Sequence, residues 1–220
     1  AIMLAILIST AAISWNFPSP FIVMLSYIGI FAAAIASVVT FGFWMPFIGF
    51  IINPRPYLAP KTWLIFAVGE GFFIGLISLS FETMFPGIVL EAVSLTFCVA
   101  ATLLFLYKSG IVKPSQNFVL MVCSAVFGIF LFYIGTFIYS LVTGVSPEIF
   151  SGSSNASIGL SLFIVAMAAF SLVLDFDIIE QSAEYGSPKY MEYFGAMALV
   201  TTLIWLYIEI LRLLAKFRSR

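Results

Sequence analysis

Hydrophobic positions along this chain gather in long runs that short polar breaks separate. Proline, glycine, asparagine and charged residues end one run and precede the next. A run of about 20 apolar residues is long enough to cross the hydrocarbon core of a bilayer as a helix. The pattern therefore predicts seven transmembrane helices, at about residues 1–16, 21–50, 62–84, 87–107, 117–143, 155–176 and 190–216.

The composition agrees with an all-α membrane protein. Of 220 residues, 63% are hydrophobic and only 9% are charged, against about 25% charged in a soluble domain. The length leaves room for spans and short loops only, so we expect one domain over residues 1–220. Because the chain opens inside an apolar run without a basic flank, we expect the numbered residues to begin within a longer natural sequence.

Charge and residue types exclude several functions. A net charge of −1 offers no basic surface for nucleic acid. The absence of histidine excludes Ser-His and Cys-His catalysis and any histidine-ligated metal, and we expect neither an enzyme nor a resident cofactor. Cys98 and Cys123 lie inside apolar runs, where we expect small buried side chains without a disulfide.

Positive charge is unevenly spread over the connections. The third and fifth connections hold only Glu82 and Glu148, whereas the basic residues of the second and fourth are Arg55, Lys61, Lys108 and Lys113. The positive-inside rule then places the second and fourth connections in the cytoplasm. Seven full spans, which we favour, would put the basic tail Lys216, Arg218 and Arg220 outside; a re-entrant late segment would keep that tail inside.

Several carboxylates stand inside the apolar runs. Each costs roughly 2.5–3.5 kcal/mol to insert, so such a group usually faces a protein interior or water. Glu70 lies in the middle of the third run. Glu91 shares one face of the fourth helix with Ser94, Cys98 and Thr102. This polar face would line a cavity or join two helices, and the sequence leaves both open.

The sixth run places its two aspartates on opposite faces. At about 100° per residue, the aspartate that shares a face with the serines is Asp175; those serines are Ser157, Ser161 and Ser171. Asp177 points to the other side with Glu180 and Glu184, which predicts a solvated exit from the membrane. We therefore expect Asp175 to face the protein interior.

The last run combines an acid and a base on one helix face. Glu209 and Arg212 stand three residues apart, a spacing at which helical side chains can pair. Glu209 is then a functional carboxylate or half of a structural ion pair near the helix end. The sequence alone does not separate these two roles.

Four segments carry a family resemblance. They are Gly69-Glu-Gly71 with Gly75, Pro86-Gly-Ile-Val-Leu-Glu-Ala-Val-Ser-Leu-Thr-Phe97, Ser171-Leu-Val-Leu-Asp-Phe-Asp-Ile-Ile-Glu180 and Leu206-Tyr-Ile-Glu-Ile-Leu-Arg-Leu-Leu214. With them the chain resembles the Bax-inhibitor-one family, most closely its bacterial branch. The resemblance implies seven helices, six of them around a central C-terminal one, in a bacterial cytoplasmic membrane.

The resemblance also implies a function. Family members of this kind are described as calcium leak channels, with a pH-sensitive latch of two carboxylates on helices six and seven; eukaryotic members suppress cell death. Asp175 and Glu209 match these acids, and Arg55 matches a basic latch residue. Glu209 replaces the usual aspartate, and the two acids are about nine residues further apart than in better-known members, so Asp177 and Glu192 remain in reserve.

These observations favour a passive cation pathway closed by Asp175 and Glu209, within hydrogen-bonding reach of each other and sharing one proton. The remaining charge would be offset by Arg55 or Arg212. Calcium prefers several oxygen ligands, and the two acids would hold it only transiently. A non-conducting regulator that binds a partner protein and a proton-coupled transporter are the alternatives. The transporter lacks a visible internal repeat.

Overall fold

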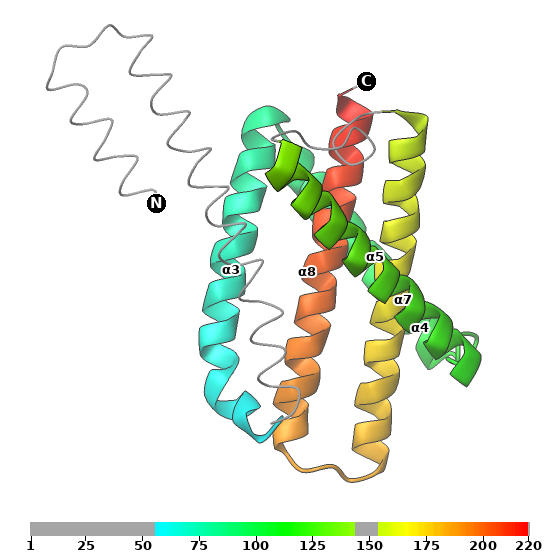
Figure 1. The fold of residues 1–220 in the computed structure, drawn as a ribbon. Helices are drawn as coiled ribbons and strands as arrows, with labels where there is room; N and C mark the ends of the chain where they lie inside the picture. Colours follow the sequence, from blue (N-terminus) through cyan, green and yellow to red (C-terminus); the bar gives the residue numbers. More distant parts are fainter. Residues whose placement is uncertain (1–55, 144–153, 220) are drawn as a thin grey trace, which may run out of the picture. The chain divides into compact units, whose positions relative to one another are not determined.

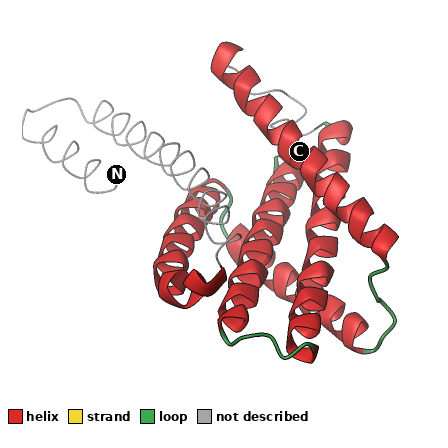
Figure 2. Cartoon of the chain, turned by 60° about the horizontal axis from the view of Figure 1, so that its bottom comes forward, coloured by secondary structure: helices red, strands yellow, loops and turns green. Residues whose placement is uncertain are grey.

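The computed structural model describes residues 56–143 and 154–219, and within these ranges the regular structure is helical throughout (Figure 1). A 3-10 turn at Pro56–Leu58 leads into the first long helix. The long helices are α3 (Ala59–Met84), α4 (Ile88–Lys108), α5 (Gln116–Thr143), α7 (Asn155–Glu184) and α8 (Tyr190–Arg218). Short loops join α3 to α4, α4 to α5 and α7 to α8 (Figure 2).

All five helices are long and apolar enough to cross a membrane. Four of them agree closely with predicted spans, and α7 begins as predicted but extends further, which confirms an all-α membrane protein. The first two predicted spans, 1–16 and 21–50, lie outside the described residues. The total of seven helices and the ring of six around one therefore stay predictions.

The chain divides into two compact units, residues 1–80 and 81–220. The first contains most of α3. In the second, α8 packs against α7 and α4, and α7 also packs against α4 and α5. A tight turn makes α7 and α8 an antiparallel pair, and α5 runs obliquely to both (Figure 1). The predicted single domain is not tested by this division.

The helix α7 is longer than the sequence predicts. It begins as expected after the N-cap Ser154, whose hydroxyl accepts a hydrogen bond from the Ser157 amide (3.2 Å). It continues to Glu184 instead of ending near residue 176. Asp177 and Glu180 accept hydrogen bonds from Tyr107 of α4, and Glu184 is exposed at the helix end, so the helix need not end at residue 176 to accommodate these acids. Only residues 185–189 form the turn, where Gly186 has a positive φ of 61°.

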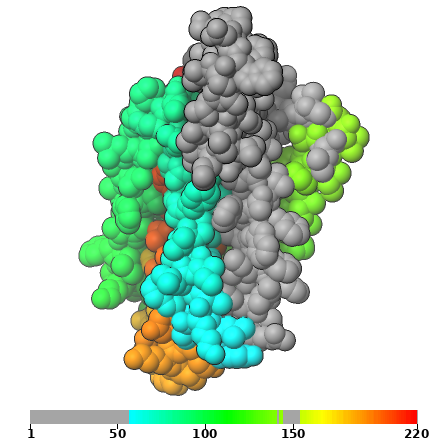
Figure 3. Space-filling view, turned by 90° about the vertical axis from the view of Figure 1, so that its left-hand side faces the viewer, coloured from blue at the N-terminus to red at the C-terminus, as the bar shows by residue number. Residues whose placement is uncertain are grey.

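Large apolar side chains cover the outer surface of α4. Leu90 is 74% exposed, Phe97 66% and Phe105 71%. Figure 3 shows the side of the molecule on which α4 is visible, in blue-green. Such a surface suits lipid acyl chains, in agreement with a span. Cys98 and Cys123 are free but exposed, so the predicted buried position is wrong for both.

A glycine allows α7 and α8 to approach closely. A Cβ added at Gly195 of α8 would lie 3.0 Å from Cγ1 of Ile179 on α7. At Gly71 and Gly75 of α3, whose four-residue spacing is typical of closely packed membrane helices, an added Cβ would meet no described atom within 4 Å. The close approach of small residues thus belongs to the α7–α8 contact.

Replacing Gly195 should therefore weaken this contact. We expect Gly195→Val to lower stability by about 1–3 kcal/mol, because the branched side chain meets Ile179 at the helix interface. The matched control is Gly128→Val on α5, where the space around the glycine is open. Thermal unfolding in detergent measures both. Equal unfolding temperatures for the two variants would contradict the close approach.

Candidate functional site

Glu209 is buried in the helical core and fully partnered. Its side chain is 2% exposed. The Tyr133 hydroxyl of α5 donates to its Oε1 (2.6 Å), and Nη1 of Arg212 donates to Oε1 (3.0 Å) and Oε2 (3.1 Å). The predicted pairing of Glu209 with Arg212 is thus confirmed, and Tyr133 is an additional member.

Tyr133 joins the acid and the base into one polar cluster. Its oxygen accepts a hydrogen bond from Arg212 Nη1 (3.1 Å) while its proton goes to Glu209. The guanidinium carbon of Arg212 also lies 5.8 Å from the centre of the Tyr133 ring, within the range of a cation–π contact. One negative and one positive charge therefore neutralise each other inside the span, with a neutral hydroxyl bridging them.

Asp175 lies on α7 without an equivalent partner. Its carboxyl is half-buried beside the Thr202 side chain of α8, but the Thr202 hydroxyl donates its proton to the Ala198 carbonyl (3.1 Å). Oδ2 of Asp175 is buried and has no hydrogen-bond partner among the described residues. The predicted inward orientation of Asp175 fits this burial, but its charge is left without a bonded cation in that part of the chain.

The structure does not bring Asp175 to Glu209, so the predicted direct contact is wrong for this conformation. The reason is the register of α7 and α8. Ser161 lies beside Lys216, and Asp175, fourteen residues further along α7, lies beside Thr202, fourteen residues back along α8. Glu209 is therefore level with Ala168, about two helical turns or roughly 10 Å from Asp175 along the axis.

Asp177 and Glu180 occupy the other side of α7. Tyr107 of α4, 9% exposed, donates towards Asp177 Oδ1 (3.2 Å) and Glu180 Oε2, and Gln181 donates to Asp177 Oδ2 (2.6 Å). The predicted solvated exit is thus only partly correct, because Asp177 is half-buried against α4. The opposite orientations of Asp175 and Asp177 are confirmed.

The other predicted acids differ in burial and in partners. Glu91 is exposed and pairs with Arg218 (2.6 Å), which also donates to the Pro86 carbonyl (2.8 Å). Glu70 in the first unit is 5% exposed, and its Oε2 has no partner among the described residues. Glu192 is exposed near the turn. Arg55 lies outside the described residues.

Two hydroxyls on the polar face of α4 bond within their own helix. Ser94 and Thr102 are exposed and donate to backbone carbonyls of their own helix (2.8 and 2.7 Å). These bonds satisfy the hydroxyls without a neighbouring helix. Of the two alternatives for this face, the contact with another helix is present at Glu91, which pairs with Arg218 of α8.

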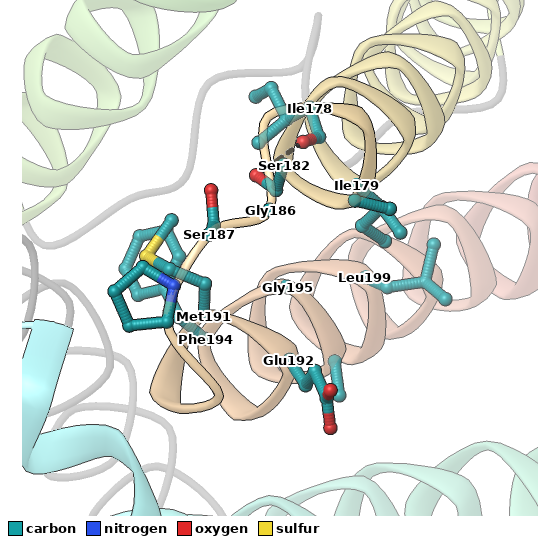
Figure 4. Close-up of a pocket in the computed structure, with 13 residues that line it drawn as sticks. Ile178, Ile179, Ser182, Gly186, Ser187, Met191, Glu192, Phe194, Gly195 and Leu199 are labelled. Carbon is teal, nitrogen blue, oxygen red and sulfur yellow. Dashed lines mark hydrogen bonds between the residues drawn. The ribbon is translucent and has the colours of Figure 1, made fainter.

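A cavity of about 520 Å³ lies between the end of α7 and the first turns of α8 (Figure 4). Its walls are mostly apolar and include Ile178, Met191 and Leu199. Glu192 lies at its α8 side, with the carboxylate directed away from Ile178 and Ser182 in Figure 4. In the described part of the chain, no three Asp, Glu or Cys side chains gather into a group that could hold a metal ion.

Sequence reasoning missed Tyr133, a member of the buried polar network. Tyr133 lies within an apolar run. Its hydroxyl group near the middle of that run is the only feature of the sequence that points to a polar role. Lys216 belongs to the basic tail, and its seven-residue steps from Glu209 and Thr202 also predict that it shares their helix face. That spacing, together with Ser157 and Ser161 on α7, is the signal that points to its inward position.

The five apolar helices and the charges buried between them define the class as an integral multi-pass membrane protein. The family model described as Bax inhibitor 1 like matches residues 1–219, and the chain therefore belongs to this family. No curated protein and no solved structure matches it.

The cluster around Glu209 makes a prediction about stability. Tyr133→Phe removes the hydroxyl that bridges Glu209 and Arg212, and we expect a loss of about 1–3 kcal/mol because a buried carboxylate oxygen loses a donor. Tyr139→Phe on the same helix is the control, since Tyr139 is 51% exposed. Unfolding in detergent measures both. A Tyr133→Phe protein as stable as the control would show that the bridge contributes nothing.

Proposed function

We propose that this protein is a pH-sensitive calcium leak and that the structure corresponds to its closed state. The observation that carries the proposal is the buried Asp175 oxygen without a hydrogen-bond partner among the described residues. A carboxylate within a span is costly, and such groups mark ion or proton paths. The family membership supports the membrane setting of the proposal.

A row of polar groups between α7 and α8 supplies the candidate pathway. Asp175 and Thr202 lie at one level, Glu209 about two turns further, and Lys216 with Ser161 two turns beyond. The fourteen residues from Thr202 to Lys216 correspond to about 21 Å of helix, or two thirds of a hydrocarbon core of about 30 Å. Oxygen atoms at such intervals are weak stopping points for a hard cation.

Apolar packing keeps this row closed. Ala168 and Leu172 on α7 and Leu206 and Leu211 on α8 are all fully buried. These side chains separate the polar levels, so an ion cannot pass between the helices as they are packed here. Opening then requires α7 and α8 to move apart.

The two acids have different parts in the pH response. The charge of Glu209 is neutralised by Arg212 and held by Tyr133, which suits a structural role. Asp175 has no bonded cation among the described residues, so gain or loss of its proton changes an uncompensated charge at the α7–α8 contact. We therefore place the pH sensor at Asp175 rather than in a proton shared with Glu209.

The proposal extends to location and permeant ion. Because of the resemblance to the bacterial branch, we propose the bacterial cytoplasmic membrane as the site of action. We propose calcium as the permeant ion because the pathway offers carboxylate, hydroxyl and carbonyl oxygens, the ligands that calcium prefers.

Calcium entry into dye-loaded proteoliposomes, measured across pH 5 to 8, tests the sensor. Asp175→Asn keeps the shape of the side chain but removes its titration, so we expect the leak to lose most of its pH dependence. Asp177→Asn, on the opposite face of α7, is the control and should keep the wild-type profile.

Three outcomes would count against the proposal. A wild-type profile for Asp175→Asn, or a flattened one for Asp177→Asn, would mean that the sensor is the other aspartate or neither. Calcium entry no faster than in protein-free vesicles at every pH would contradict the leak itself and leave the non-conducting regulator as the better account.

A further inference from the structure

Lys216 is buried at the end of the polar row. Its side chain lies near the end of α8, yet the residue is only 6% exposed. Nζ donates to the Ser157 hydroxyl (2.7 Å), the Ser161 hydroxyl (2.8 Å) and the Ser157 carbonyl (3.3 Å). An ammonium group has three donors and no acceptor. Three oxygen partners therefore fit a charged lysine.

The inward position of Lys216 is not imposed by its place in the chain. It is two residues from the end of α8, and a long lysine side chain so placed normally extends to the interface and its water. Arg218, at the helix end, is partly exposed and pairs with Glu91. Lys216 instead turns between α7 and α8, towards the two serines.

Among the described residues, no acidic side chain bonds to Lys216. All three oxygen atoms that it contacts belong to uncharged groups. The charged groups whose fields reach it are Arg212 and Glu209, and these two pair with each other. Ser157 also lies in the first turn of α7, where the helix dipole is positive. Counted over residues 56–143 and 154–219, this end of the row therefore carries net positive charge.

We propose that Lys216 is a specificity-determining residue of the leak, a fixed positive charge that repels cations at the α7 N-terminal end of the row in the closed state. The inference rests on the proposed function. A carboxylate partner would neutralise the charge of Lys216 and remove the barrier. The serine oxygens hold the ammonium group in place without neutralising it. Conduction of cations then requires Lys216 to leave the row when α7 and α8 separate.

Removal of the charge need not leave the serines without partners. Serine hydroxyls elsewhere in these helices donate to the carbonyl four residues earlier: Ser78, Ser80, Ser94, Ser124, Ser171 and Ser182. Without Lys216, Ser161 can donate to the Ser157 carbonyl in the same way. Lys216→Met, of similar length, and Lys216→Gln, which can still donate to the serines, are therefore suitable neutral variants.

The test compares ion entry into proteoliposomes for the wild type, Lys216→Met, Lys216→Gln and Lys216→Arg, with calcium, potassium and chloride as the probes. We expect both neutral variants to raise calcium and potassium entry roughly tenfold at the pH where the wild type is mostly closed. Brief separations of α7 and α8 then meet no positive charge, and a unit charge at close range is a large barrier in a low dielectric. Chloride entry should not rise. Lys216→Arg keeps the charge and should stay close to wild type, as should Lys113→Met, which removes an exposed lysine.

The outcomes separate this inference from the proposed function. If the wild type conducts calcium but the folded neutral variants conduct no more than it does, Lys216 is no barrier and only the inference fails. If neither the wild type nor the neutral variants conduct, both fail. If both neutral variants fail to fold while Lys216→Arg folds, the lysine is required for structure and the barrier is overturned.

Discussion

The antiparallel packing of α7 against α8 is the contact on which the other features depend. Inside a bilayer, polar side chains have no water to bind and must find partners within the protein. At the α7–α8 contact, Lys216 donates hydrogen bonds to two serines. Tyr133 of α5 donates a hydrogen bond to Glu209. Near the turn between them, Gly195 allows the two helices to approach closely. The register of the pair then decides which groups meet.

That register gives the interior three electrostatic levels. Glu209 and Arg212 cancel each other, Lys216 adds a positive charge, and Asp175 lies about two turns from Glu209 without a bonded cation among the described residues. A neutralised centre resists changes in pH, whereas an uncompensated acid responds to them. We propose that closure by apolar packing and sensing by Asp175 are separate tasks on the same helix pair.

The sequence predicted the helices better than the contacts between them. Long apolar runs are sufficient to place spans, and a three-residue spacing is sufficient to pair Glu209 with Arg212. The partner Tyr133 lies 76 residues from Glu209, and no local pattern connects the two. The pairing of Asp175 with Glu209 failed because it depends on how far α7 extends and on its register against α8. The inward turn of Lys216 depends in turn on serines 55 and 59 residues away.

The claim that α7 and α8 part to form the pathway can be tested at Ala168, which is fully buried and level with Glu209. Cys98 and Cys123 are first replaced by alanine, and Ala168→Cys is introduced. This variant is treated with a charged, water-soluble thiol reagent, and its modification rate is divided by that of free cysteine at each pH. Our account predicts that the modification rate rises and falls with calcium entry across pH 5 to 8. It also predicts that the modified protein no longer admits calcium. Calcium entry that proceeds while Ala168→Cys stays unmodified would contradict it.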